Sequence, residues 1–129
     1  MDQLLDAGIT KVVICTGYMG DYLEEKIGSS YLDLQIVYSK ESIALGTAGA
    51  LKHASVHFNT QHTLVLNGDS YLDCNIDAFY RWHRDRSATI TLALVETNDG
   101  DRYGKVEINE IGVINAIGGI LGDSRIMLR

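Results

Sequence analysis

The sequence predicts an α/β protein in three layers, with a mostly parallel sheet between helices. Short apolar runs rich in β-branched residues alternate along the chain with stretches of helical character. The composition, 46% hydrophobic and 22% charged over 129 residues, is that of an ordinary globular protein. We therefore expect one domain over residues 1–129.

Each expected element follows from a local pattern. The run KVVIC at 11–15 is β-branched, and Gly8 stands where a helix C-terminal cap glycine would. Asn75 is placed to cap a following helix. The predicted strands are residues 11–15, 34–38, 63–66 and 88–95, and the predicted helices are residues 1–7, 21–27, 48–56 and 75–85.

Two further strands are expected near the C-terminal end. Residues 104–108 and 113–117 flank Asn109-Glu110-Ile111-Gly112, which is a hairpin signal. This antiparallel hairpin would lie beside the parallel strands. Residues 118–129 carry no clear period.

Charge and composition exclude several classes of protein. The net charge is −6 with no cluster of Lys and Arg, which argues against a nucleic-acid surface. No apolar run approaches the roughly 20 residues of a membrane-spanning helix. The two cysteines, Cys15 and Cys74, are expected to be unpaired in a reducing cytoplasm, and Cys15 is interpreted as a small core residue.

The turn Asn67-Gly68-Asp69 is the first candidate site. It follows the apolar run at 63–66, which reads as a strand buried on both faces. Ligands bind beyond the carboxyl ends of strands in open α/β sheets, and a carboxylate there can hold Mg²⁺ against a phosphate. The alternative is a polar turn without a ligand, because these residues are common turn formers.

The loop at residues 41–50 is the second candidate. Gly46, Ala48 and Gly49 leave room for a ligand near the backbone, and Thr47 opens a helix whose free N–H groups favour an anion or a carbonyl oxygen. The alternative is that Thr47 is only a helix N-cap. Both loops are expected at one edge of the sheet.

Together these loops resemble the sugar-1-phosphate nucleotidyltransferase family, in particular its mannose-1-phosphate and heptose-1-phosphate guanylyltransferase branch. The matching residues are Gly8-Ile9, Gly17-Tyr18, Tyr38-Ser39, Glu41, Leu45-Gly46-Thr47-Ala48-Gly49-Ala50, Leu66-Asn67-Gly68-Asp69, His83 and Arg102-Tyr103-Gly104-Lys105-Val106. The resemblance implies a three-layer Rossmann-like nucleotidyltransferase fold.

The resemblance also implies an activity, transfer of a nucleotidyl group from a nucleoside triphosphate to a sugar 1-phosphate with release of pyrophosphate. It implies that Asp69 is catalytic and holds Mg²⁺, and that Tyr103 and Gly104 approach the sugar. The residues that it implies around the nucleotide are Glu41, Leu45, Gly46, Thr47, Gly49, Asn67 and Gly68.

Departures from the family pattern define a second hypothesis. The sequence contains no Gly-Gly-x-Gly-Thr-Arg-Leu loop, which cradles the triphosphate in the family, and no counterpart of the later sugar-binding part. The fold is therefore expected to be incomplete. The alternative function is a non-catalytic domain that binds at most a nucleotide or a partner subunit.

The same departures leave two apolar strands, 11–15 and 63–66, without the strand that separates them in the family. Unpaired edges favour association. We expect these strands to pair directly or the chain to form a homo-oligomer.

Overall fold

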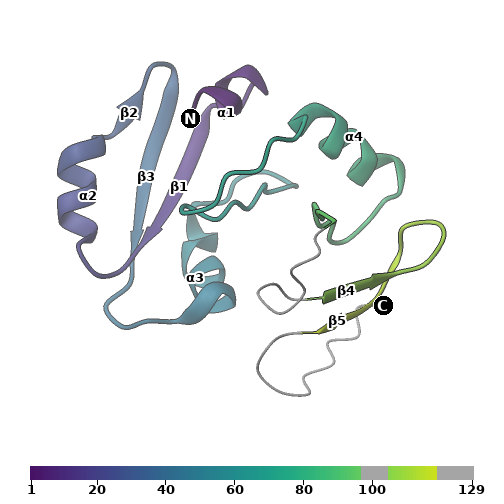
Figure 1. Ribbon diagram of the computed structural model, residues 1–129. Helices are drawn as coiled ribbons and strands as arrows, with labels where there is room; N and C mark the ends of the chain where they lie inside the picture. Colours follow the sequence, from purple (N-terminus) through teal and green to yellow (C-terminus); the bar gives the residue numbers. More distant parts are fainter. Residues whose placement is uncertain (97–104, 119–129) are drawn as a thin grey trace. The chain divides into compact units, whose positions relative to one another are not determined.

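The computed structural model describes residues 1–96 and 105–118. The chain divides into two compact units, Met1–Thr89 and Ile90–Arg129, and each is described by itself (Figure 1). The expectation of a single domain stays a prediction. No helix in the described ranges is long and apolar enough to cross a membrane.

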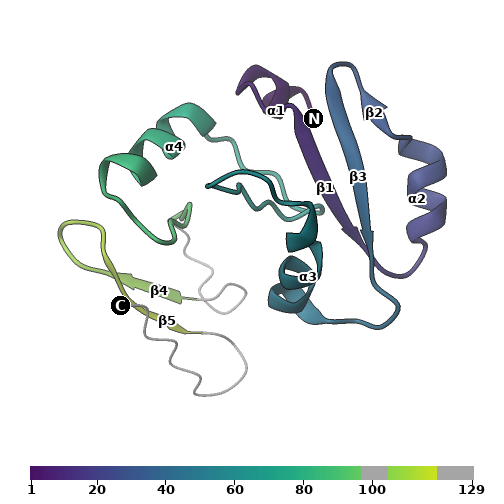
Figure 2. The ribbon, with the colours of Figure 1, turned by 180° about the vertical axis from the view of Figure 1, so that it is seen from behind.

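The first unit is built on a mixed three-stranded sheet in the order β1–β3–β2. β1 (Lys11–Thr16) runs parallel to β3 (Leu34–Lys40), and the short β2 (Ser30–Tyr31) pairs antiparallel with β3. The three strands lie side by side in both views (Figures 1 and 2). The strands predicted over 11–15 and 34–38 are therefore confirmed, each with a slightly later end.

Helices cover both faces of this sheet. Side chains alternate along a strand, so Tyr38 and Ser39 face opposite sides. The Tyr38 hydroxyl donates to the Gly28 carbonyl oxygen at 2.7 Å, at the end of α2 (Gly20–Ile27). On the other side, Cys15, which is paired with Ser39, donates from its thiol to the Ala50 carbonyl oxygen at 3.9 Å.

Ala50 belongs to α3 (Gly46–Ala54), which is followed by a 3₁₀ turn, η1 (Ser55–His57). The helices α2 and α3 thus lie on opposite faces, as the three-layer prediction requires. The helix predicted over 48–56 begins two residues earlier than expected. The Lys11 ammonium group also donates to the His57 carbonyl oxygen at 2.8 Å, which ties η1 to β1.

The apolar core of the first unit is small. Leu34 and Ile36 are buried on the α2 face of β3, and Ala54 is buried at the end of α3. Cys15, interpreted from the sequence as a core residue, is exposed at the end of β1. That interpretation is wrong because α3 covers only part of this face of the sheet.

The helix caps predicted at Gly8 and Asn75 are confirmed. α1 (Asp2–Asp6) ends on Gly8 at φ 71°, where the Gly8 and Ile9 N–H groups donate to the Leu5 and Leu4 carbonyl oxygens. This is a Schellman motif, which needs the left-handed backbone that glycine provides without strain.

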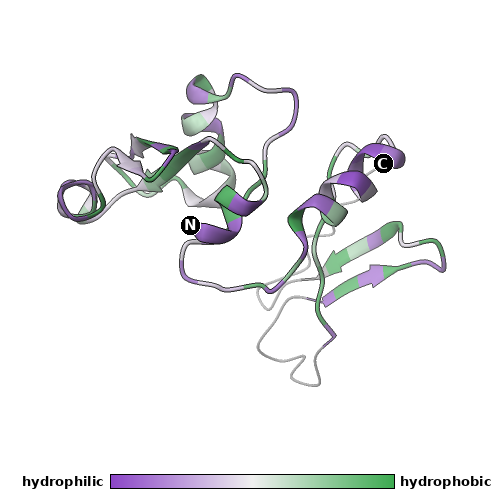
Figure 3. Cartoon of the chain, turned by 90° about the horizontal axis from the view of Figure 1, so that it is seen from above, coloured by the Kyte–Doolittle hydropathy of each residue, from purple (hydrophilic) through white to green (hydrophobic). Residues whose placement is uncertain are grey.

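The fourth helix, α4 (Ile76–Asp85), begins where the Asn75 side chain accepts a hydrogen bond from the Ala78 N–H at 2.8 Å. This is the expected N-cap. Most of α4 is hydrophilic in Figure 3, and Trp82 on it is 48% exposed.

Two predicted strands do not form. Residues 63–66 and 88–95 have no strand partner within the described residues, and they expose apolar side chains such as Leu66 (54%) and Ile90 (56%). β-Propensity expresses how a residue fits a pleated, half-buried surface, so it does not produce a strand where no neighbouring strand supplies hydrogen bonds. Direct pairing of residues 63–66 with β1 is thus not observed, and homo-oligomerisation stays a prediction.

The hairpin prediction is confirmed in the second unit. β4 (Lys105–Ile108) pairs antiparallel with β5 (Ile114–Gly118). The Asn109 side-chain oxygen accepts hydrogen bonds from the Ile111 and Val113 N–H groups, and Gly112 takes φ 81°. Asparagine and glycine therefore make the turn, as the sequence signal implies.

Candidate functional site

The loop after β3 begins with a glutamate that fixes the loop's own shape. The Glu41 N–H donates to the Thr16 carbonyl oxygen at 2.7 Å, which extends the parallel ladder one residue beyond β3. The Glu41 carboxylate then accepts a hydrogen bond from the Leu45 N–H at 3.0 Å. Residues 41–45 are thus closed into a compact loop that leads directly into α3.

Two glycines set the geometry where this loop enters α3. Gly46 has φ 69°, a left-handed conformation that costs other residues about 1–2 kcal/mol. A Cβ atom built on Gly49 would lie 2.7 Å from the Leu45 Cβ, far inside a normal carbon contact. Glycine at 49 therefore lets Leu45 lie against the first turn of the helix. Gly46 and Gly49 are needed here for packing and conformation, whether or not a ligand binds.

The capping interpretation of Thr47 is wrong. The N-cap of α3 is Leu45, no side chain caps the helix, and Thr47 is an exposed residue of its first turn. The first N–H groups of a helix have no partner within the helix, so the start of α3 keeps donors available for an acceptor. This is the property that the ligand-binding interpretation of the loop requires.

The Glu41 carboxylate also acts on the end of β1. The pKa of the Cys15 thiol is raised, first because this largely exposed side chain is partly shielded from water and second because of the negative charge of Glu41. A raised pKa keeps the thiol protonated and weakly nucleophilic at neutral pH. Cys15, Glu41 and the first turns of α3 therefore form one group around the carboxyl ends of β1 and β3. The sequence pattern did not bring Cys15 into this group.

The second candidate loop is an exposed turn. Asn67, Gly68 and Asp69 are all exposed, and a Cβ atom on Gly68 would meet nothing within 4 Å. The Ser70 hydroxyl donates to one Asp69 carboxylate oxygen at 3.1 Å. Because residues 63–66 are not a strand, the expectation that this turn lies at the sheet edge beside the 41–50 loop loses its basis. No hydrogen bond or ion pair joins the two loops in the described part of the chain.

The segment before this turn is attached to α4 by an aromatic cluster that the sequence did not reveal. The His62 ring lies edge-on to Tyr80 and His83, with ring centroids 5.6 and 5.1 Å apart. The Tyr80 hydroxyl and His62 Nδ1 are 3.3 Å apart. These contacts place the start of the segment that carries Asp69.

The metal and sugar positions remain predictions. Within residues 1–96 and 105–118, no group of three or more His, Cys, Asp and Glu side chains is arranged to hold a metal ion. A single carboxylate still fits Mg²⁺, which commonly binds one or two carboxylates together with substrate phosphates. Tyr103 and Gly104, implied near the sugar, lie outside the described residues.

The comparisons with known proteins define the family. The family model described as nucleotidyl transferase matches residues 1–118, and the chain belongs to this family. The similarity extends to sugar-1-phosphate guanylyltransferases and to a crystal structure with the same fold.

Three relatives illustrate the match. A D-glycero-α-D-manno-heptose 1-phosphate guanylyltransferase of Aneurinibacillus thermoaerophilus is 33% identical over 83% of this chain and 46% of its own length. A mannose-1-phosphate guanylyltransferase of Mycobacterium tuberculosis is 31% identical over 85% of this chain and 31% of its own length. The crystal structure of HddC from Yersinia pseudotuberculosis, complexed with GMP-PN, has a TM-score of 0.78 at 26% identity and covers 92% of this chain and 52% of that chain. This chain thus spans about a third to a half of the length of each of these three relatives.

Proposed function

We propose that this chain supplies the nucleoside-binding part of a sugar-1-phosphate guanylyltransferase. The observation that carries the proposal is the closed loop of residues 41–49, which joins β3 to α3 through Glu41, Gly46 and Gly49. Its compact backbone and uncapped helix start suit the approach of a flat base and its ribose. The match to guanylyltransferases, and the GMP-PN present in the HddC crystal, favour a guanine nucleotide.

The reaction proposed for the whole site is an in-line displacement. A phosphate oxygen of the sugar 1-phosphate attacks the α-phosphorus of GTP and forms a new P–O bond, while the bond to the β-phosphate breaks and pyrophosphate leaves. Catalysis of this kind depends mainly on positioning and on neutralising negative charge.

The chain's own residues have separate tasks in this proposal. Glu41 and the loop up to Gly49 hold the base and ribose, and Asn67 and Gly68 lie along the nucleotide. Asp69 would hold Mg²⁺, which would supply positive charge to the phosphates. Tyr103 and Gly104 would contact the sugar. The free thiols of Cys15 and Cys74 suit a reducing cytoplasmic location.

Calorimetric titration with GTP, and separately with ATP, in the presence of Mg²⁺ tests the proposal. We expect GTP to bind more tightly, and we expect Glu41→Gln and Asp69→Asn to weaken GTP binding by about tenfold, the effect of losing one charged contact. Asp33→Asn is the matched control, because Asp33 lies between β2 and β3 at the opposite end of β3. Removal of Mg²⁺ should abolish the difference between the parent chain and Asp69→Asn.

Absence of GTP binding at millimolar nucleotide would contradict the proposal and favour the non-catalytic alternative. Equal weakening by Asp33→Asn would show that net charge, rather than the 41–49 loop or Asp69, governs the interaction. Turnover with mannose and heptose 1-phosphates, followed by pyrophosphate release, then tests the reaction itself.

A further inference from the structure

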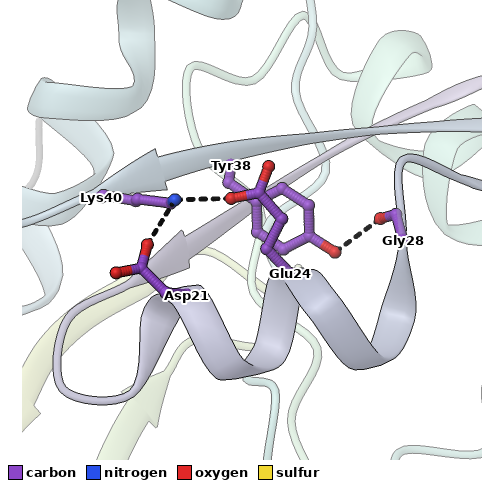
Figure 4. Close-up of polar contacts among 5 residues, drawn as sticks. All are labelled: Asp21, Glu24, Gly28, Tyr38 and Lys40. Atoms are coloured by element: carbon purple, nitrogen blue, oxygen red, sulfur yellow. Dashed lines mark hydrogen bonds and ion pairs between the residues drawn. The ribbon is translucent and has the colours of Figure 1, made fainter.

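A lysine at the end of β3 connects the sheet to α2. Lys40 is the last residue of β3, and its ammonium group donates to the Asp21 carboxylate at 2.7 Å and also pairs with Glu24 (Figure 4). Asp21 and Glu24 are one helical turn apart on α2, so one lysine contacts both. We call Asp21, Glu24 and Lys40 the α2 clamp.

The clamp holds the same strand end that begins the 41–49 loop. On the β1 side, the Glu41 N–H donates to the Thr16 carbonyl oxygen at 2.7 Å. On the α2 side, no residue separates the clamp from Glu41, because Lys40 and Glu41 are consecutive. The end of β3 is therefore restrained both by the ladder and by α2.

These restraints control the direction of the Glu41 side chain. Consecutive residues of a strand face opposite sides, so Lys40 faces α2 while Glu41 faces α3. There its carboxylate accepts the Leu45 N–H. If the end of β3 rotated about its own axis, Lys40 would leave the clamp and Glu41 would turn away from Leu45. The two contacts are thus coupled through a single stretch of backbone.

We propose that Lys40 is a positioning residue for the nucleoside loop, acting through Glu41 without touching the nucleotide. This proposal rests on the proposed function only in its final step, from loop geometry to nucleotide affinity. Its first step, that the clamp orders the Glu41–Leu45 contact, concerns the chain without any ligand.

Because the α2 clamp is exposed, its ion pairs are sensitive to salt. The Asp21 side chain is 93% exposed and the Lys40 side chain is 45% exposed. The pKa of Lys40 is raised and that of Asp21 is lowered by their contact, as expected for a formed ion pair. Exposed ion pairs are screened by added salt. The order of the 41–45 loop should therefore fall as the salt concentration rises.

Amide hydrogen exchange on the ligand-free chain tests the first step. The N–H groups of Glu41 and Leu45 report directly on the two hydrogen bonds that hold the loop. We expect Lys40→Met to speed their exchange by about two- to fivefold at low salt, the range that exposed ion pairs contribute. Lys40→Arg should restore slow exchange. Lys26→Met is the control, because Lys26 also lies on α2, but its contacts are with residues of the same helix: Glu25 at 4.0 Å and the Tyr22 ring, whose centroid is 5.5 Å from the ammonium group.

The parent chain supplies an internal check. Raising the salt concentration should speed exchange at Glu41 and Leu45 in the parent chain and leave Lys40→Met nearly unchanged. If exchange at these amides is the same in the parent chain, Lys40→Met and Lys26→Met, the inference is overturned whatever the nucleotide result.

Titration with GTP and Mg²⁺ tests the second step. We expect Lys40→Met to weaken binding by about the same two- to fivefold factor, beyond any effect of Lys26→Met, which removes the same charge. If exchange responds but the parent chain binds no GTP, the proposed function fails while the control of the loop by Lys40 stands. If exchange responds and GTP affinity matches that of Lys26→Met, the role of Lys40 in nucleotide binding is overturned.

Discussion

The contact between Gly49 and Leu45 gives the sharpest test of how the candidate loop is built. In an exposed helix interior, replacing glycine by alanine stabilises a protein by about 1 kcal/mol. At position 49 the added Cβ atom would lie 2.7 Å from the Leu45 Cβ, which is bonded directly to the backbone and cannot swing aside. Overpacking of this kind costs about 1–3 kcal/mol. Subtracting the gain in helix propensity from the cost of overpacking leaves a net destabilisation of about 0–2 kcal/mol, which is the change in unfolding free energy that we expect for Gly49→Ala.

A double-mutant cycle isolates this contact. Leu45→Gly removes the obstructing Cβ atom, and glycine is tolerated at an N-cap. In the Leu45→Gly background, Gly49→Ala should stabilise the chain by about 1 kcal/mol, so the effect of the same substitution changes direction. The coupling between the two positions should be about 1–3 kcal/mol.

Urea unfolding of the four proteins measures the cycle. The free energies of unfolding are compared only if the four proteins share the same m value, the slope of the unfolding free energy against urea concentration. A change in the unfolded state is then not mistaken for an effect of the contact. Equal stabilisation by Gly49→Ala in both backgrounds would refute the reasoning. It would mean that Leu45 does not lie against the first turn of α3.

Two further predictions concern Thr16, at the carboxyl end of β1, and the α2 clamp. The Thr16 hydroxyl is buried without a hydrogen-bond partner in the described structure. Thr16→Val should therefore raise the free energy of unfolding by about 1 kcal/mol, whereas Thr16→Ser should lower it. A loss of stability in Thr16→Val, measured by urea unfolding, would show that the hydroxyl has a partner. Hydrogen bonding and charge from Lys40 lower the pKa of Asp21, so its stabilising contribution is present above the pKa of the unfolded chain and is lost as the pH falls through the lower folded value. Carboxyl NMR titration should therefore show the Asp21 midpoint rising in Lys40→Met, and an unchanged midpoint would contradict the clamp.

The caps and the turn that the sequence predicted correctly are fixed by nearby residues. Gly8 ends α1, Asn75 begins α4, and the turn between β4 and β5 depends on Asn109 and Gly112. Each of these features needs only a backbone conformation or a hydrogen bond within a few residues. The family could also be identified from the sequence, because the loop at residues 41–50 and the turn at Asn67–Asp69 carry their motifs in short stretches.

The candidate site shows the limit of such local evidence. The sequence marked Glu41, Leu45 and Gly49 as site residues, but it did not show that Glu41 closes the loop on Leu45 or that Gly49 is required by the Leu45 side chain. Nor did it indicate Lys40, whose partner Asp21 lies 19 residues earlier in the chain. Contacts between segments so far apart leave no periodic pattern in the sequence.

By itself, the sequence determined the family, the helices and the C-terminal hairpin, and the caps at Gly8 and Asn75. The tertiary structure decided which apolar runs become strands. β1 and β3 find each other and form a parallel pair, while the equally apolar residues 63–66 and 88–95 find no strand partner in the described part of the chain. The physical reason is that a strand is completed by hydrogen bonds to a neighbour, whereas a cap or a turn is completed within its own segment.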